Sequence, residues 1–462
     1  MFSLLISFFN ILRVISKKQI LTHSATLNLP YRIQIIGWLI SIIFYPMGIV
    51  KKPKDNFGTR LSDCLKALGP IYIKFGQTLS TRPDLIGLDI AKSLQTLQDK
   101  LTPFSSNVAR EMIVKSFEKD VEDLFSVFED VPVAAASISQ VHKAHLKSGE
   151  WVAVKILRPN IHHTYNRDIK LLYFLARLAT KFLTKLKRLK PVAVIDVFNN
   201  TMKFELDLRL EAAAASELSD NFKNDRDIYI PKVYWELTSE YILATEWVDG
   251  ISIYDKAALT EHGIDLSLVA KRFVIMFFNQ VYRDGFFHAD LHPGNILVQQ
   301  DARLVLLDFG IMGRLSDKDR LAIAESLFGF LSKDYKLVAK VHLRAGYIPE
   351  NTDLDCFALS CRAVTEPITG LPIKDISIGK LLTQLFKITE DFGMEVQPQL
   401  LLLQKTIVVV EGVGHQLNPD LNMWVLLEPW MKKWAVKNLS PEAKILRILK
   451  HLISEISERL SQ

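Results

Sequence analysis

His-Ala-Asp-Leu-His-Pro-Gly-Asn, residues 288–295, and Asp-Phe-Gly, residues 308–310, are the two stretches of sequence that decide the fold. Between them lie two short apolar segments joined by a Gln-Asp turn, a pattern that predicts a β-hairpin. Phosphoryl transfer needs a carboxylate near the acceptor hydroxyl and oxygen ligands for Mg²⁺, because catalysis is mainly positioning and charge neutralisation. We therefore predict that Asp290 is the base or orienting carboxylate and that Asn295 and Asp308 hold Mg²⁺.

A lysine that would fix the nucleotide phosphates lies upstream of these stretches. Residues 133–142, a polar turn at 147–150 and the segment Trp-Val-Ala-Val-Lys-Ile-Leu, residues 151–157, predict a second hairpin. Lys155 in this segment is the predicted contact to the α and β phosphates of ATP. A lysine in a strand is usually solvated and an Asp-Phe-Gly tripeptide is often only a turn. Here the lysine, the stretch at 288–295 and the Asp-Phe-Gly tripeptide occur in the same order as in protein kinases. A chance occurrence of the whole set is therefore implausible.

The lysine needs an acidic partner, and a helical pattern from about residue 160 to residue 218 offers several. On a continuous helix, Asp207 and Glu211 are four residues apart and share a face, whereas Glu205 points to a different face. We predict that Glu211 forms the ion pair with Lys155 and that Glu205 is free to meet another group. Glu217 is predicted to be a solvated residue.

Composition and length limit the classes of protein that remain. The 462 residues are too many for one core of usual size, which predicts two lobes with extra segments. The chain is 49% hydrophobic and 23% charged with a net charge of +6, typical of a globular protein with some membrane affinity. The charge favours anionic lipid headgroups or phosphates over nucleic acid as partners, and we predict no nucleic-acid partner. Three cysteines without paired spacing favour a reducing compartment.

The N-terminal region is apolar. Residues 33–50 form the longest uncharged stretch, which is barely long enough for a bilayer span and contains Gln34 and Pro46, so we expect a buried or interfacial helix rather than a span. No positive residue precedes the apolar run at residues 1–15, so we predict no cleaved signal. Residues 60–100 predict short packed helices, because Gly69-Pro70 and Arg82-Pro83 interrupt the helical pattern.

This sequence departs from ordinary protein kinases in several features, and in these features it resembles the UbiB family of atypical kinases. Residues 288–295 correspond to the catalytic loop of protein kinases. This catalytic loop has Ala289 in place of the usual arginine and His292 where Ser/Thr kinases usually have lysine, and no Ala-Pro-Glu follows. The 56 positions between Lys155 and Glu211 leave room for a helical insertion. The phosphate loop is alanine-rich where a protein kinase has glycines that let the backbone approach phosphate. This loop consists of Ala134, Ala135, Ala136, Ser137, Ile138 and Ser139.

Two further motifs carry the resemblance, which runs from about residue 55 to residue 435. Lys74-Phe-Gly-Gln77 is similar to the family's lysine-x-glycine-glutamine motif, and Glu205-Leu-Asp207 is similar to its glutamate-x-aspartate motif. The resemblance implies that Lys74, Gln77, Glu205 and Asp207 are regulatory, that Lys74 pairs with Glu205, and that the lysine motif covers the place where a protein substrate would dock.

The resemblance also implies a fold class, cofactors and a cellular role. We expect an α+β, bilobal protein-kinase-like fold with a β-rich N-lobe, helical insertions, a mainly helical C-lobe and a helical N-terminal extension. We expect ATP and Mg²⁺ as cofactors and a role in ubiquinone biosynthesis at the cytoplasmic face of the bacterial inner membrane. Expected partners are membrane lipids, quinone precursors or quinone-biosynthesis enzymes, and a second copy of the chain in a homodimer. The nucleotide-binding residues are expected to be the alanine-rich loop, Lys155, Glu211, Glu246 and Val248.

The expected divisions of the chain follow these motifs. They are hydrophobic N-terminal helices at 1–52, an extension with the Lys-x-Gly-Gln motif at 53–125, a kinase-like N-lobe at 126–250, a kinase-like C-lobe at 251–435 and an amphipathic C-terminal helix at 436–462. A basic cluster in the insertion, from Lys181 to Lys190, is a second candidate for headgroup contact, although a solvated face is the ordinary explanation.

Two other functions remain open on the sequence alone. The stretch at 288–295 also resembles that of aminoglycoside phosphotransferases, which makes a small-molecule or lipid kinase an alternative. The alanine-rich loop and the lysine motif are also compatible with a nucleotide-binding pseudokinase scaffold for a biosynthetic complex.

Overall fold

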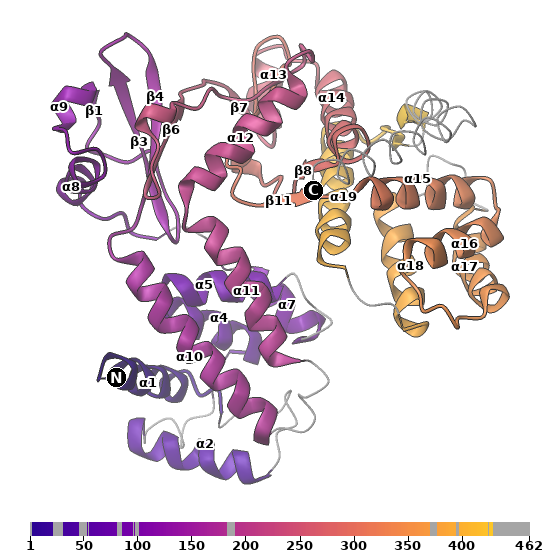
Figure 1. The fold of residues 1–462 in the computed structure, drawn as a ribbon, viewed down its shortest axis with the longest axis horizontal. Helices are drawn as coiled ribbons and strands as arrows, with labels where there is room; N and C mark the ends of the chain where they lie inside the picture. Colours follow the sequence, from indigo (N-terminus) through magenta and orange to yellow (C-terminus); the bar gives the residue numbers. More distant parts are fainter. Residues whose placement is uncertain are drawn as a thin grey trace, which may run out of the picture. The chain divides into compact units, whose positions relative to one another are not determined.

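We describe the fold from a computed structural model of the chain, shown in Figure 1. The structure describes residues 2–21, 31–45, 53, 55–80, 86–95, 97, 101–182, 190–369, 377–393, 397–423 and 425–427. The chain divides into two units. Unit 1 comprises Met1–Ser216 and Pro231–Trp247, and unit 2 comprises Glu217–Ile230 and Val248–Gln462. Each unit is described by itself.

Unit 1 contains an antiparallel sheet in the order β1-β3-β4-β6, with β2 paired to β3. The strands are β1 (Phe125–Phe128), β2 (Ala134–Ala135), β3 (Ser139–Leu146), β4 (Trp151–Leu157) and β6 (Ile242–Glu246). Along β3, fully buried residues alternate with half-buried ones, as a pleated strand with one face on the core requires. The predicted hairpin is confirmed, because β3 and β4 pair with the register Val141 to Lys155.

Helices make up the rest of unit 1, and Figure 1 shows α4, α5, α7, α10 and α11 grouped together. Their bounds are α1 (Phe2–Lys17), α2 (Tyr31–Phe44), α4 (Phe57–Leu68), α5 (Pro70–Ser80), α7 (Leu88–Gln95), α8 (Ser106–Phe117), α9 (Val121–Leu124), α10 (Ile161–Phe182), α11 (Pro191–Glu205), α12 (Leu208–Phe222) and the 3₁₀ helix η3 (Trp235–Leu237). The short packed helices expected around residues 60–100 are confirmed by α4, α5 and α7. The last residues of α12, from Glu217, belong to unit 2.

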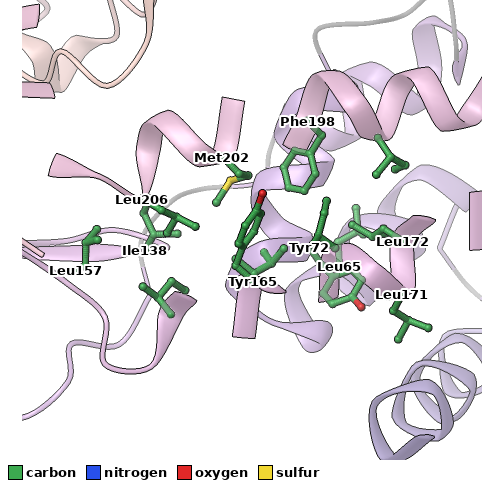
Figure 2. Packing of buried hydrophobic residues seen from close by; sticks show 14 of the residues in the cluster. Leu65, Tyr72, Ile138, Leu157, Tyr165, Leu171, Leu172, Phe198, Met202 and Leu206 are labelled. Carbon is green, nitrogen blue, oxygen red and sulfur yellow. The ribbon is translucent and has the colours of Figure 1, made fainter. Parts of the chain in front are cut away.

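A hydrophobic core joins these helices to the sheet. Its buried residues come from α1, α4, α5, α7, α10, α11 and α12 and from the strand ends. Figure 2 shows Tyr72, Tyr165, Phe198 and Leu157 among them. Phe198 is fully buried, and its ring lies 5.2 Å from that of Phe75 between centroids. The helical extension and the sheet therefore share one apolar interior within unit 1.

The prediction that one continuous helix carries both Glu205 and Glu211 is wrong. Two helices are present, since α11 ends at Glu205 and α12 begins at Leu208. Asp207 lies between them and its Oδ1 accepts a hydrogen bond from Arg209 N at 3.1 Å, which is how an aspartate caps a helix start. Asp207 and Glu211 therefore do not share a face of one helix. Outside the named strands, Val233 and Thr245 form an isolated antiparallel bridge.

Unit 2 contains two small sheets and a bundle of helices. Its strands are β5 (Ile228–Tyr229), β7 (Ile251–Ser252), β8 (Phe286–His288), β9 (Ile296–Val298), β10 (Leu304–Leu306) and β11 (Met312–Arg314). The predicted hairpin at 295–308 is confirmed as β9 paired with β10. Further strands that the sequence did not predict accompany this hairpin, because β7 pairs with β9, β5 with β10 and β11 with β8. Strands of two or three residues are too short to show periodicity.

The helices of unit 2 are α13 (Lys256–Glu261), α14 (Leu266–Phe278), the π-helix η4 (Asn279–Asp284), the 3₁₀ helix η5 (Pro293–Asn295), α15 (Asp317–Leu331), α16 (Tyr335–Ala345), α17 (Leu354–Thr369), α18 (Ile378–Asp391) and α19 (Pro398–Leu417). The expected C-terminal helix at 436–462 lies outside the described residues, as do residues 46–50 and the middle of the basic cluster, 183–189. Among the helices that the structure describes, none has the length and apolar character needed to cross a bilayer.

Candidate functional site

The three polar residues predicted for catalysis and metal binding lie close together in unit 2. Asn295 comes just before β9 and Asp308 comes just after β10, and the antiparallel pairing of Ile296 with Leu306 brings the two positions to the same end of the hairpin. The main chain closes this end, because Leu307 N donates to Asn295 O at 2.9 Å. Asn295 Nδ2 donates to Asp290 O at 3.0 Å. The structure thus brings Asp290, Asn295 and Asp308 together.

A buried histidine fixes the loop that carries Asp290. His288 has no exposed surface. Its Nδ1 lies 3.1 Å from the donor Asp290 N, and its Nε2 lies 3.1 Å from Leu307 O. An accepting Nδ1 and a donating Nε2 define a neutral ring, and burial lowers the pKa of His288, which keeps it neutral. The histidine therefore ties the Asp290 loop to the strand end that precedes Asp308.

Asp308 has an unusual backbone. Its φ is +57°, which lies in the left-handed region of the backbone. Residues other than glycine, asparagine and aspartate rarely adopt this conformation. Its Oδ1 lies 3.3 Å from the donor Gly310 N, and the carboxylate is exposed. Phe309 is buried beside the His288 ring, with 5.8 Å between ring centroids. A buried phenylalanine and a strained backbone hold the Asp308 carboxylate outward, and strain of this kind is concentrated at functional sites.

These residues fit Mg²⁺ bound together with a phosphorylated ligand. Mg²⁺ usually takes one or two protein carboxylates or carbonyls and fills its octahedron with water and phosphate oxygens. Asp308 offers a carboxylate, and Asn295 offers Oδ1 because its amide nitrogen is bonded to the main chain. Within the described ranges no cluster of three or more His, Cys, Asp or Glu side chains could hold a metal alone. The donor set therefore suits a shared metal rather than a structural one.

The predicted ion pair in unit 1 is confirmed. Lys155 Nζ on β4 donates to Glu211 Oε1 at 2.8 Å and to Oε2 at 2.9 Å. The two side chains are 18% and 7% exposed. Glu217 is half-exposed and, rather than being only solvated, pairs with Arg314 at 2.6 Å in unit 2. Glu246 Oε2 accepts from Lys232 N at 3.2 Å, and Val248 is the first residue after the boundary between the units.

The alanine-rich loop is held by an arginine that sequence reasoning missed. Arg158 donates from Nε to Ser137 O at 2.9 Å and from Nη2 to Ala136 O at 2.9 Å and Thr102 O at 3.1 Å. The only signal in the sequence is a basic residue that closely follows the Lys155 strand. Arg158 fixes the loop carbonyls, and the Ala136 N–H donates to Ser139 O at 2.8 Å. An anion would therefore meet other main-chain N–H groups of the loop.

Not every member of the predicted loop offers its side chain to a nucleotide. The side chain of Ile138 belongs to the hydrophobic core, so its predicted role in nucleotide binding is limited to the main chain. The hydroxyl of Ser137 is buried without a hydrogen-bond partner among the described residues. Ser139 is also buried, whereas Ala134 is exposed and Ala135 and Ala136 are half-buried. An orphaned hydroxyl costs about 1–3 kcal/mol, and sites that bind ligands tolerate such a cost.

The Lys74 motif is built into the helical extension. Lys74 Nζ lies 3.0 Å from Glu205 Oε2, so the predicted pair is confirmed, with side chains 16% and 8% exposed. A Cβ on Gly76 would lie 2.4 Å from Leu97 Cδ1 and 2.6 Å from Leu65 Cδ1, so any larger residue here would displace these two leucine side chains. Gln77 Nε2 donates to Leu97 O at 3.1 Å. The motif thus packs α5 and pairs it with the end of α11, and its regulatory role stays a prediction.

Comparison with known proteins places the chain in a family. Residues 96–342 match the ABC1 atypical kinase-like domain and residues 361–422 match the UbiB helical domain. A protein of Marinobacter nauticus named "Probable protein kinase UbiB" is 43% identical to this chain, over 91% of this chain and 77% of that protein. The protein of the same name from Azotobacter vinelandii is 42% identical, over 90% of this chain and 78% of that protein. That of Pseudomonas fluorescens is 39% identical over 98% of this chain and 87% of its own length.

A solved structure shows the same fold. The structure of Rv3197 from Mycobacterium tuberculosis in complex with erythromycin matches with a TM-score of 0.52 and 24% identity over 76% of this chain and 90% of that one. The expected α+β, bilobal kinase-like fold is confirmed by this match and by the domain match. With 39–43% identity to its UbiB relatives over most of its length, the chain belongs to the UbiB family of ABC1 atypical kinase-like proteins.

Proposed function

We propose that this protein binds ATP with Mg²⁺, turns it over, and supports ubiquinone biosynthesis at a membrane. One observation carries the proposal: Asp290, Asn295 and Asp308 converge at one end of the β9-β10 hairpin, and the main chain and a neutral buried histidine hold them there. The chain's membership of the UbiB family supports the link to ubiquinone. Phosphoryl transfer needs these groups for positioning and charge neutralisation rather than for covalent chemistry.

Each residue has a role that follows from its surroundings. When bound, Mg·ATP supplies the transferable phosphoryl group and a divalent charge. Asp308 and Asn295 Oδ1 would hold the metal, and Asp290 would orient and deprotonate the attacking hydroxyl or water. Lys155 would bind phosphate oxygens, and Glu211 keeps its ammonium group in place through two short hydrogen bonds. Arg158 would keep the alanine-rich loop in one conformation for contact with phosphate.

An apolar surface on unit 1 supports the membrane part of the proposal. On α2, Ile35, Trp38, Leu39 and Ile42 are each about 40–50% exposed and Ile43 is 73% exposed. This spacing forms one helical stripe. The buried side of the same helix carries small residues, because Ser41 is 3% exposed and a Cβ on Gly37 would lie 2.7 Å from Leu21 Cβ. The helix therefore packs through its small residues and presents its large apolar ones outward.

Neighbouring helices extend this surface and give it a charge. Ile6 and Phe9 on α1 are 56% and 53% exposed, and Phe174 on α10 is 50% exposed. The rings of Phe8 and Phe174 are 6.0 Å apart, so α1 and α10 lie side by side. The helices α1 and α2 contain no acidic residue, and α1 carries Arg13 and Lys17. An apolar stripe on two helices whose own charged residues are all basic suits an anionic lipid surface. Helix α2 is about 21 Å long, too short to span a core of about 30 Å.

The catalytic part is tested by ATP hydrolysis with the purified protein. Asp308→Asn removes the metal-binding charge while retaining a residue that tolerates positive φ, so loss of activity reports on the charge and not on backbone strain. Asp301→Asn, in the turn at the opposite end of the same hairpin, is the matched control. We expect Asp308→Asn and Asp290→Asn to lose most activity and Asp301→Asn to keep it. Equal activity in all four proteins would refute catalysis at this site.

The membrane part is tested by flotation with vesicles. Wild type is expected to bind vesicles of phosphatidylcholine with phosphatidylglycerol more strongly than vesicles of phosphatidylcholine alone. Trp38→Ser with Ile42→Ser should lower binding several-fold. Val408→Ser with Leu359→Ser, at apolar residues of unit 2 that are 48% and 67% exposed, is the matched control. Unchanged binding by the α2 variant would contradict the assignment of this surface.

A further inference from the structure

A lysine on helix α19 contacts the predicted catalytic aspartate. Lys405 Nζ lies 3.6 Å from Asp290 Oδ1, and both side chains are about 40% exposed. Among the residues that the structure describes, Lys405 is the only charged side chain that pairs with the Asp290 carboxylate. Lys405 lies in the segment that matches the UbiB helical domain, whereas Asp290 lies in the ABC1 domain. Both residues belong to unit 2.

The position of this lysine is set by the packing of α19. Leu403, Ile407 and Val410 are buried on the inner face of the helix, which leaves Lys405 at its edge. The next residue, Thr406, is 1% exposed, and its hydroxyl lies 2.8 Å from Leu402 O and 3.4 Å from Ala289 O. Two adjacent residues of α19 therefore lie beside two adjacent residues of the catalytic loop. The contact is part of the fold rather than a chance approach of a long side chain.

The catalytic loop itself lacks a positive charge at the two positions where one is expected. Ala289 carries none and is 1% exposed. His292 is engaged with the main chain, since its Nδ1 accepts from Gly294 N at 3.4 Å and thereby caps η5. Lys405 thus brings the only cation that the structure shows beside Asp290. A carboxylate that must orient an acceptor next to phosphate gains from a fixed cation, because both its position and the local negative charge matter.

We propose that Lys405 is a positioning residue for Asp290, which holds the carboxylate in place and supplies the positive charge that Ala289 and His292 do not. The proposal rests on the proposed function, because Asp290 must take part in turnover of ATP. Its contribution to stability is small, because solvent screens an ion pair that is this exposed. The effect of losing the lysine on catalysis is therefore measurable in a folded protein.

The test compares three substitutions at Lys405 in steady-state ATP hydrolysis. Lys405→Met keeps the length of the side chain and removes the charge, Lys405→Arg keeps the charge, and Lys405→Ala leaves space for an added amine. We expect Lys405→Met to lower kcat by about 10- to 100-fold, the cost of a misplaced catalytic group, with KM for ATP changed less than about twofold. Lys405→Arg should retain most of kcat, and ethylamine should restore activity to Lys405→Ala. Lys340→Met, at an exposed lysine of α16, is the matched control.

The outcomes separate this inference from the proposed function. Wild-type kcat in Lys405→Met, while Asp308→Asn is inactive, would overturn the role of Lys405 and leave the proposed function standing. Equal losses in Lys405→Met and Lys405→Arg without rescue by ethylamine would show that the residue acts only through packing, which also overturns the proposal. Absence of ATP hydrolysis in wild type, or full activity in Asp308→Asn, would overturn both.

Discussion

Removing the charge of Lys155 should destabilise unit 1 strongly, and removing its partner as well should reverse most of that effect. Lys155→Met keeps the length of the side chain but leaves the Glu211 carboxylate, 7% exposed, without the ammonium group that binds both of its oxygens. A buried charge that loses its partner is far more costly than a buried pair replaced by apolar side chains.

The magnitude follows from this burial. Leaving one member of a buried pair uncompensated costs about 3–5 kcal/mol, which corresponds to a fall in Tm of roughly 6–20 °C for a domain of this size. Lys155→Met with Glu211→Leu removes both charges of this pair, so the double variant should unfold within about 1 kcal/mol of wild type. Thermal unfolding followed by circular dichroism measures both. The double variant is nevertheless expected to hydrolyse no ATP, since the phosphate-binding lysine is gone.

Two results would refute this reasoning. A Tm for Lys155→Met within 2 °C or so of wild type would show that Glu211 is solvated or compensated in another way. A double variant as unstable as the single one would show that packing, rather than the unpaired charge, causes the loss. Lys147→Met, in the exposed turn of the same hairpin, is the control and should leave Tm unchanged.

Three further predictions concern pH, packing and the alanine-rich loop. Burial lowers the pKa of His342 to about 4, so its stabilising effect is complete above its unfolded pKa of about 6.5 and is lost as pH falls below that value. At pH 5 the loss is about 2 kcal/mol in urea unfolding, and His342→Gln should flatten this dependence. Phe198→Ala should cost about 3–5 kcal/mol, while Phe204→Ala on the same helix, at a ring 60% exposed, should be nearly neutral. Arg158→Lys should raise KM for ATP several-fold with little change in Tm, because one ammonium group cannot hold three carbonyls.

Each of these has a clear contrary result. An unchanged pH dependence in His342→Gln would mean that another group titrates in this window. Equal destabilisation by Phe198→Ala and Phe204→Ala would contradict the assignment of the core. A normal KM in Arg158→Lys would mean that the loop carbonyls do not need the arginine fork.

The polar residues of the site were predictable because their types and order are dictated by chemistry. Asp290, Asn295, Asp308 and Lys155 could be identified from motifs, and the hairpin between Asn295 and Asp308 follows from alternating apolar residues and a turn. The Lys155–Glu211 pair could be predicted from the need for a buried counter-charge. The break at Asp207 was missed because a leucine- and alanine-rich segment reads as one helix, and only the capping bond to Arg209 N reveals the end.

Contacts made by tertiary packing were not predictable in this way. Lys405 reaches Asp290 only because α19 packs against the catalytic loop, and nothing near Lys405 in the sequence marks it as part of a site. Arg158 directly follows β4, as Lys147 directly follows β3, so its position in the sequence does not mark it as part of a site. The two-residue strand β7 and the three-residue strands β8 and β11 lack any period, and their pairing depends on neighbours distant in the sequence.

The most direct test of the central claim is the Mg²⁺ dependence of ATP binding, measured as the shift in Tm of the purified protein. ATP with Mg²⁺ should raise the Tm of wild type, and ATP with EDTA should raise it much less. Asp308→Asn should lose the Mg²⁺-dependent part of the shift, and Asp301→Asn should keep it. The account would be contradicted by a shift of equal size in Asp308→Asn, or by no shift in wild type at millimolar Mg·ATP.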